Sequence, residues 1–439
     1  MSTEMVEGIT KIAVTGFKSL AKECAIDIRP LTILAGANSS GKSSIMQPLL
    51  MLKQTLEAPY DPGPLLIDGP NVQFTLVEQF LSKLVDKESA NRFQIRIGTH
   101  GFDSYFLTTT IFRKGQGGIE LVEMTREDKS EDAPSWCPKH ITLSPEMNPE
   151  EIKSLADQHL IPKGSDAVGR SRCFLRFESQ DGYTSLNITN NLESYIFNSI
   201  HLPGLRGNPE RTYKLASTGP QYPGTFENYV ASIIHDWQET GDERLKMLAD
   251  DLYKLGLTGQ VGTKKIGDTR IELQVGLLPP PPASGGEGGG MDMVSIADVG
   301  FGVSQVLPVL VALIVARPGQ LVYLEQPELH LHPRAQVALA QEMAAAAKRG
   351  VRVVAETHSS LLLLSVQTLV AEGKLSPELV KLHWFRRGES GATKIDTADL
   401  DEVGAYGDWP EDFDDVDLKA QSRYLNAVDG IAFGKTEAS

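Results

Sequence analysis

The hydrophobic pattern of this chain begins with three short apolar runs. They cover Lys11–Phe17, Ala25–Ile28 and Leu31–Ala35. Apolar residues then recur at helical spacing, at Ile45, Leu49, Leu50 and Leu52. The pattern predicts three strands and a helix, with a kink or a late helix start at Pro48 because proline cannot donate a backbone hydrogen bond.

The middle of the chain changes to a period of two. Arg92–Met124 alternates between apolar and polar positions, which predicts a meander of antiparallel strands. Strand-like runs return at Cys173–Glu178 and Ser194–His201, and Leu202–Arg211 reads as a rigid connector. Glu227–Leu255 carries apolar residues at helical spacing, and we expect this stripe to pack in the core.

Core-like elements return near the end of the chain. Leu278–Gly290 is rich in proline and glycine and predicts a mobile loop. Ser295–Gln305 then forms a Gly-rich turn before an apolar helix. Gly319–Leu324 and Val351–Ala355 read as buried strands that end in polar residues. In open α/β sheets ligands bind at such strand ends.

Composition narrows the class of protein. The formal charge of −15 argues against a protein that coats nucleic acid with its whole surface, but it leaves room for a local basic groove. The longest uncharged apolar run, Val306–Ala316, is too short to span a bilayer, and the acidic start does not resemble a signal peptide. Cys24, Cys137 and Cys173 lack metal-like spacing and favour reduced thiols. We therefore expect a cytoplasmic protein with no membrane partner.

One motif carries specific chemistry. Gly36–Ser43 has the spacing G-x-x-x-x-G-K-S between a predicted strand and a predicted helix. The glycines let the backbone wrap around phosphate oxygens, and the helix N-terminus adds N–H donors. Lys42 can neutralise the outer phosphates, and the Ser43 hydroxyl can bind Mg²⁺. The predicted nucleotide contacts are Gly36, Asn38, Ser39, Ser40, Gly41, Lys42, Ser43 and Ser44.

Two residues outside the loop are further candidates. A carboxylate at the tip of a buried strand is the expected second arm for Mg²⁺, so Glu325 joins Ser43 as a predicted metal ligand. Phe17 could stack on a purine ring beside the P-loop, or it could be an ordinary core residue. Both interpretations of Phe17 stay open.

Together these motifs resemble an ABC-type ATPase of the SMC/RecF/OLD branch, found among the AAA-family ATPases of prokaryotes. The matching segments are Gly16–Ser19, the Walker A run Gly36–Ser43, the signature-like run Asp298–Gln305, the Walker B and D-loop run Glu325–Pro333, and the switch residue His358. The tail Gly407–Phe413 also resembles a C-terminal module of some of these ATPases.

The resemblance implies a head-to-tail homodimer with two ATP molecules between the P-loop of one subunit and the signature of the other. Gly302, Ser304 and Gln305 would then contact the nucleotide across the interface. A higher oligomer and DNA as a partner stay open. Several relatives are anti-phage defence ATPases that hold or release a nuclease partner, whereas others act in DNA repair.

The chain departs from the family pattern at one position. The usual strand end is an acidic pair, with the first carboxylate for Mg²⁺ and the second for the attacking water, but here the pair is Glu325-Gln326. A glutamine cannot accept a proton at neutral pH, although it can orient a water molecule. Either hydrolysis is slow or Glu328 takes part; a helix-start role for Glu328 is the alternative. The catalytic candidates are therefore Glu325, Gln326, Glu328 and His358.

Two other features allow competing interpretations. His330 and His332 suggest a metal, but two imidazoles alone make a poor site, and packing across the dimer beside the D-loop is the favoured interpretation. Asp399–Asp417 is densely acidic, which indicates a solvated tail or a docking strip for a basic partner. No cluster of nuclease type stands out.

We predict an α/β fold, an ABC-ATPase head with a P-loop mixed sheet, an antiparallel β subdomain and an inserted α+β region. The expected divisions are residues 1–75 for the first part of the core, 76–277 for the insertion, 278–293 for a loop, 294–394 for the rest of the core and 395–439 for an acidic module. Three functions fit: an ATP-gated switch that controls an effector, plausibly in anti-phage defence; a RecF- or SMC-like DNA-repair ATPase; and a nucleotide sensor or scaffold with little turnover.

Overall fold

A computed structural model of the chain describes residues 7–83, 89–101, 104–130, 139–157, 165–179, 185–189, 191–217, 219–276 and 293–407. The Pro/Gly-rich run Leu278–Gly290, the residue Cys137 and the acidic positions after 407 lie outside these residues, so their interpretations stay predictions. Cys24 and Cys173 are buried free thiols. Among the described helices, none combines the length and the apolar character needed to cross a membrane.

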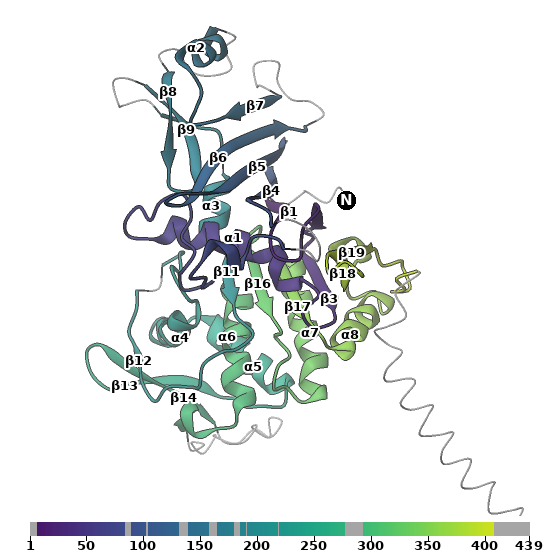
Figure 1. Ribbon diagram of the computed structural model, residues 1–439. Coiled ribbons are helices and arrows are strands. Elements are labelled where there is room, and N and C mark those ends of the chain that lie inside the picture. Colours follow the sequence, from purple (N-terminus) through teal and green to yellow (C-terminus); the bar gives the residue numbers. More distant parts are fainter. Residues whose placement is uncertain are drawn as a thin grey trace, which may run out of the picture.

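A mixed six-stranded sheet forms the centre of the molecule (Figure 1). Its strands, in spatial order, are β11 (Ile200–Leu202), β16 (Leu321–Glu325), β17 (Arg352–Thr357), β3 (Leu31–Gly36), β18 (Val380–Arg387) and β19 (Thr393–Ala398). The first five run parallel, and β19 is antiparallel to β18. The central strands β3 and β17 are buried along their whole length because both faces of the sheet are covered.

A second, antiparallel sheet lies above the first in Figure 1. Its strands, in spatial order, are β2 (Cys24–Asp27), β1 (Gly8–Thr15), β4 (Arg92–Gly101), β5 (Ser104–Gly115), β6 (Gly118–Asp128) and β7 (His140–Leu143). Helix α1 (Lys42–Glu57) lies between the two sheets, where Ile45, Met46 and Leu49 join side chains of both in one apolar cluster. The predicted meander is therefore a β subdomain resting on the P-loop helix.

The opposite face of the central sheet is covered by helices (Figure 1). They are α4 (Glu227–Thr240), α5 (Glu243–Lys254), α6 (Phe301–Val315), α7 (Pro333–Lys348) and α8 (Ser360–Ala371). Beside them is a small sheet of β12 (Tyr213–Lys214), β13 (Val261–Lys265), β14 (Arg270–Gly276) and β15 (Met293–Ser295). At the far end of the β subdomain are α2 (Pro149–Asp157), β8 (Ser165–Ser171), β9 (Phe174–Ser179) and β10 (Ser185–Asn187).

Three predicted elements differ from the structure. The run Ser194–His201 is not one strand, because Leu192 and Ile196 place one apolar face on the short helix α3 (Leu192–Phe197) before β11 begins. The predicted helix Glu227–Leu255 is two helices, since Gly241 adopts φ 68° and Asp242 caps α5 through the N–H of Arg244.

The third difference concerns the P-loop helix. It begins at Lys42 and continues through Pro48, so the expected late start is wrong. Pro48 lies in the second turn, inside the helix, and is buried against the apolar cluster. The chain thus places Lys42 and Ser43 in the first helical turn, directly after the glycine turn.

The predicted α/β class and antiparallel β subdomain are confirmed, but two boundaries differ. Strand β11 falls inside the expected insertion, yet it pairs in parallel with β16 and so belongs to the central sheet. Strands β1 and β2 fall inside the expected core, yet they pair with each other and with β4 in the antiparallel sheet. Long-range strand pairing, which local patterns do not report, decides both boundaries.

Candidate nucleotide-binding site

The P-loop joins the end of β3 to the start of α1, and two glycines make its path possible. Gly36 has φ 141° and Gly41 has φ 107°, both in the region that favours glycine. A Cβ atom at Gly36 would lie 2.2 Å from the carbonyl oxygen of Phe385 on β18. At Gly41 it would lie 2.4 Å from Oγ1 of Thr393 on β19. The loop is therefore closely backed by the last two strands of the sheet.

Thr393 holds the back of this loop. Its hydroxyl lies 2.7 Å from the Ser40 carbonyl oxygen and 2.8 Å from Ser19 Oγ. Its backbone N–H donates to the Ser19 carbonyl over 2.8 Å. The Gly16–Ser19 turn and β19 thus support the P-loop from behind.

Lys42 occupies the inside of the loop. Its Nζ donates to the carbonyl oxygens of Gly36 and Ala37, each at 2.9 Å, and the residue is 3% exposed. Burial lowers the pKa of the Lys42 ammonium, and the charges of Glu356 and Glu328 counteract part of that shift. Phosphate oxygens in the loop would give this ammonium anionic acceptors in place of neutral carbonyls.

Ser43 faces a carboxylate that the sequence analysis missed. Its Oγ donates to Oε1 of Glu356 over 3.0 Å, and the hydroxyl of Tyr323 donates to Oε2 over 3.0 Å. Burial raises the pKa of Glu356, and the neighbouring Glu325 adds to the rise. Glu356 is the next-to-last residue of β17, and Glu325 is the last residue of β16. A carboxylate at the end of a buried strand is the pattern that predicted Glu325, and the same pattern could have predicted Glu356.

Glu325 lies beside Glu356 in the register of β16 and β17. His201 Nε2 donates to its Oε1 over 3.1 Å, and the Gly204 N–H donates to its Oε2 over 3.2 Å. Burial alone would raise the pKa of Glu325, but the interactions with His201 and the Gly204 N–H outweigh it and lower the pKa below its ordinary value. Glu325 is thus held as a carboxylate.

A hydroxyl and two carboxylates form a donor set that suits Mg²⁺, which prefers hard oxygen ligands. Within the described residues, no group of three or more His, Cys, Asp or Glu side chains could hold a metal ion by itself. A magnesium ion at this site would therefore need Ser43 and phosphate or water oxygens as well as the strand-tip carboxylates.

Gln326 and Glu328 have distinct environments after β16. Gln326 adopts φ 42°, a left-handed conformation uncommon for residues other than glycine, and its N–H donates to the Glu356 carbonyl over 2.8 Å. Glu328 is 8% exposed, and its Oε1 accepts from Thr357 Oγ1 at 2.6 Å and from the His358 N–H at 3.1 Å. Glu328 therefore supports the segment that carries His358.

The helix-start interpretation of Glu328 is wrong. Helix α7 begins five residues later, at Pro333, with His332 as its N-cap: Nδ1 of His332 accepts from the Arg334 N–H. The ring of His330 lies 6.1 Å from that of Phe301, centre to centre, so the D-loop contacts the start of α6. These contacts give His330 and His332 structural roles.

His358 lies next to the P-loop. Partial burial and the nearby Lys42 charge lower the pKa of this imidazole, and a hydrogen bond with the Gly36 backbone opposes the shift. The ring is therefore neutral at neutral pH, where it can both accept and donate a hydrogen bond beside the phosphate cradle.

The signature-like residues divide into partly buried and buried positions. Gly300 is the N-cap of α6, so Gly302 and Ser304 lie in its first turns, as the Gly-rich turn predicted. Ser304 is partly buried, and its hydroxyl donates to the Phe301 carbonyl over 3.1 Å. Gln305 is buried and donates to the backbone of the connector, at the carbonyls of Arg206 and Gly207. The contact of Gln305 with nucleotide stays a prediction, and in the single chain this side chain holds the connector against α6.

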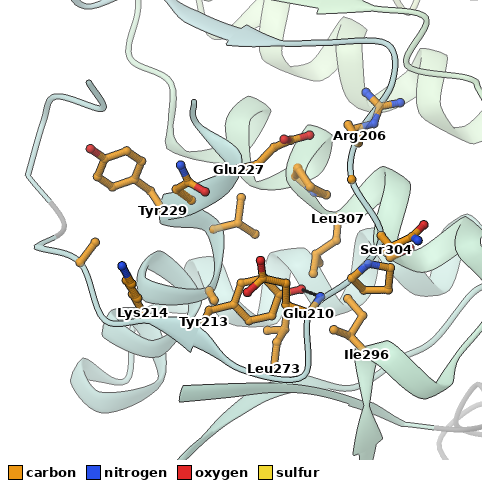
Figure 2. A pocket seen from close by; sticks show the side chains of 18 of the residues that line it. Arg206, Glu210, Tyr213, Lys214, Glu227, Tyr229, Leu273, Ile296, Ser304 and Leu307 are labelled. Carbon is orange, nitrogen blue, oxygen red and sulfur yellow. Dashed lines mark hydrogen bonds between the residues drawn. The ribbon is translucent and has the colours of Figure 1, made fainter. Parts of the chain in front are cut away.

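A cavity of about 570 Å³ lies behind Ser304, between α4, α6 and the connector (Figure 2). Figure 2 shows Arg206 and Glu227 near one end of it and Tyr213 with Glu210 near the other. None of its lining residues belongs to the P-loop. The cavity thus adjoins the signature helix but is separate from the phosphate cradle.

Phe17 does not present its ring to this site. The residue is fully buried, with its ring 5.6 Å from those of Phe80 and Phe93 and 6.3 Å from that of Phe74. The purine-stacking interpretation is wrong, and the core alternative describes the structure. The sequence around Phe17, an apolar turn beside a P-loop, does not distinguish a core residue from one that stacks on a purine.

Solved structures of SMC head domains are similar to this chain. One Smc head bound to the C-winged helix domain of ScpA is 13% identical, with a TM-score of 0.49, and the match covers 90% of this chain and 99% of that one. An SMC head from Thermotoga maritima is 10% identical, with a TM-score of 0.41 and coverage of 89% and 98%.

A third match is an Smc head with an extended coiled coil, bound to the C-terminal domain of ScpA and derived from Pyrococcus furiosus. It is 11% identical, with a TM-score of 0.48 and coverage of 96% and 99%. Likenesses at this level carry no argument about function. No curated protein matches the chain.

A family model matches residues 31–365, which include the P-loop, the signature-like turn and both strand-tip carboxylates. Its description is "AAA domain, putative AbiEii toxin, Type IV TA system". The match spans well over half of the chain, and the chain therefore belongs to this family of AAA domains.

Proposed function

We propose that this protein binds ATP with Mg²⁺ in the P-loop, hydrolyses it slowly and acts in the cytoplasm as a dimeric switch that controls an effector protein in anti-phage defence. The observation that supports binding is the cradle itself. Lys42 Nζ lies inside the loop against two carbonyl oxygens, and Ser43 bonds to a strand-tip carboxylate. Both groups are placed where a nucleotide triphosphate and its cation would meet them.

Different residues would bind the phosphates and the magnesium ion. Lys42 exchanges the Gly36 and Ala37 carbonyls for phosphate oxygens, while the N-terminal N–H groups of α1 face the phosphates. Ser43 and Glu325 would hold Mg²⁺, with Glu356 beside them. The bound ion supplies positive charge to the outer phosphates.

Slow hydrolysis follows from the residues around the attacking water. Gln326 can orient a water molecule but cannot take its proton. Glu328 is buried, and its Oε1 accepts from Thr357 and the His358 N–H, which holds this carboxylate against the segment of His358. The same observation favours a second candidate, a nucleotide sensor with little turnover.

The test of binding is Lys42→Ala. Removing a charge-assisted contact with phosphate costs roughly 1.5–3 kcal/mol, so ATP affinity should fall by about tenfold to a hundredfold or more. Isothermal titration calorimetry measures the affinity, and Lys374→Ala, at an exposed lysine outside the site, is the matched control. An affinity of Lys42→Ala within threefold of wild type would refute the P-loop assignment.

A further inference from the structure

A buried imidazole links Glu325 to the segment that follows the P-loop helix. We propose that His201, with Asn71 behind it, is a positioning residue that fixes the Glu325 carboxylate for the magnesium ion of the bound nucleotide. This inference rests on the proposed ATP- and Mg²⁺-binding function. The sequence pattern predicts only that His201 ends a strand.

The geometry fixes the ring of His201 from several sides. Nε2 donates to Glu325 Oε1 over 3.1 Å, which leaves Nδ1 of the neutral ring as an acceptor 3.1 Å from the end of the Asn71 side-chain amide. The amide nitrogen of Asn71 has no other partner among the described residues and is the donor that Nδ1 requires. The ring of Tyr323 stacks on it with the centres 5.3 Å apart and the planes 12° apart. His201 is 4% exposed. With both ring nitrogens engaged and one face covered, the imidazole has a single orientation.

The sheet explains why His201 reaches Glu325. Strand β11 pairs in parallel with β16, so His201 lies opposite Tyr323, and Glu325 follows two residues later on the same face. The chain then turns, and the Gly204 N–H reaches Oε2 of Glu325. One short segment therefore donates to both oxygens of the carboxylate and fixes its rotation.

Asn71 connects this arrangement to the P-loop helix. The backbone N–H of Asn71 donates to Gln54 Oε1 over 3.2 Å, and that oxygen also accepts from the Val72 N–H over 3.0 Å. Gln54 lies on α1, the helix whose first turn contains Ser43. These contacts thus connect Glu325 to α1, about three turns after the helix turn that contains Ser43.

Such a network suits magnesium chemistry. Mg²⁺ requires near-octahedral geometry, so a carboxylate that is already oriented binds it better than one that rotates. Partners that orient metal ligands typically account for ten- to hundredfold of metal affinity or activity. Glu356 has other partners, Ser43 and Tyr323, and so does not duplicate the His201 contact.

The test compares His201→Phe, which keeps a flat ring beside Tyr323 but no donor, with His201→Gln, which keeps a donor. Mn²⁺ replaces Mg²⁺ as the probe, and electron paramagnetic resonance measures its binding to the protein with ATP present. We expect His201→Phe to weaken Mn²⁺ binding by about ten- to hundredfold and His201→Gln to recover most of it. ATP affinity in EDTA, measured by calorimetry, should stay within twofold of wild type for both.

The matched control is His235→Phe, at another buried histidine that bonds to Thr263 far from the carboxylates; it should leave Mn²⁺ binding unchanged. Asn71→Ala should weaken Mn²⁺ binding by less than His201→Phe, and the double variant should be no worse than His201→Phe alone because both act through one carboxylate.

Wild-type Mn²⁺ affinity in folded His201→Phe would overturn the inference. If that variant does not fold, unchanged Mn²⁺ affinity in Asn71→Ala would do the same. Failure of the wild-type protein to bind ATP under any condition would instead contradict the proposed function, so the two failures are distinguishable.

Discussion

At the scale of single residues, three glutamates beside the P-loop differ in their hydrogen-bond partners. Glu325 is oriented by His201, Glu356 accepts from Ser43, and Glu328 accepts from the segment of His358. Their different partners separate their chemistry, although Glu356 and Glu328 both lie close enough to Lys42 to interact with its charge. None of the three stands where the usual second carboxylate of the strand end would be, at Gln326.

We therefore expect Gln326→Glu to raise the turnover rate. A carboxylate at this position could take a proton from the attacking water, and a tenfold gain would correspond to about 1.4 kcal/mol off the barrier. Steady-state phosphate release measures the rate, with Gln341→Glu on the exposed face of α7 as the control. Glu328→Gln should change the rate little, because a glutamine oxygen can still accept from Thr357 and the His358 N–H. Fast wild-type turnover would contradict the proposal that Gln326 orients the attacking water without taking its proton.

At the scale of elements, the P-loop depends on strands that come last in the chain. Strand β18 pairs with the whole length of β3. Strand β19 contains Thr393, which contacts the back of the loop. His383 joins β18 to the antiparallel sheet: its Nε2 donates to the Asp27 carbonyl over 2.9 Å, and its Nδ1 lies 3.0 Å from Thr397 Oγ1. These contacts are made by the neutral imidazole.

This strand contact predicts a pH dependence of stability. Burial lowers the pKa of His383 to about 4, and the hydrogen bond to Asp27 opposes the shift only in part. The unfolded chain takes up the proton near pH 6.5, whereas the folded chain does not until about pH 4. Folding stability should therefore fall as the pH drops through this window, by roughly 3 kcal/mol in total from this residue.

Urea unfolding between pH 7 and pH 4 measures the effect. Carboxylates also titrate in this range, so the comparison is with His383→Gln, which should lose this part of the slope. His140→Gln, at an exposed histidine, is the control and should keep the wild-type slope. Equal slopes in wild type and His383→Gln would contradict the assignment.

At the scale of the whole molecule, one chain holds its phosphate cradle, and the start of α6 lies at the surface. Ser304 is partly buried, and Phe301, three residues before it on the same helix, is 55% exposed. The exposed aromatic ring beside Ser304 leaves this turn accessible to a partner chain. A second copy of the chain, with its P-loop facing Ser304, is the occupant that the dimer proposal requires.

Mixing two inactive variants tests this arrangement. Lys42→Ala should weaken nucleotide binding, and Ser304→Arg should block ATP-dependent dimerisation and hydrolysis without weakening ATP binding to the monomer. A heterodimer of the two keeps one intact site, formed by the P-loop of one subunit and the signature of the other. With random pairing the mixture should recover at most about a quarter of wild-type ATPase activity. No recovery, while crosslinking demonstrates heterodimers, would contradict sites shared between subunits.

The sequence by itself determined the features that depend on neighbouring residues. The spacing from Gly36 to Ser43 predicted the loop, the apolar run before it predicted β3, and the Gly-rich turn predicted the start of α6. Turn geometry and burial patterns depend on residues within a few positions of one another, so local reading is sufficient for them.

Only the tertiary structure decided which side chains meet. Ser43 bonds to Glu356, 313 residues away, and His201 bonds to Glu325, 124 residues away. The order and register of the strands determine these pairs. The alternation of apolar and polar residues within one strand does not indicate which strand lies beside it. The same limit hid the burial of Phe17 and Gln305, because the aromatic cluster and the connector that enclose them come from distant segments of the chain.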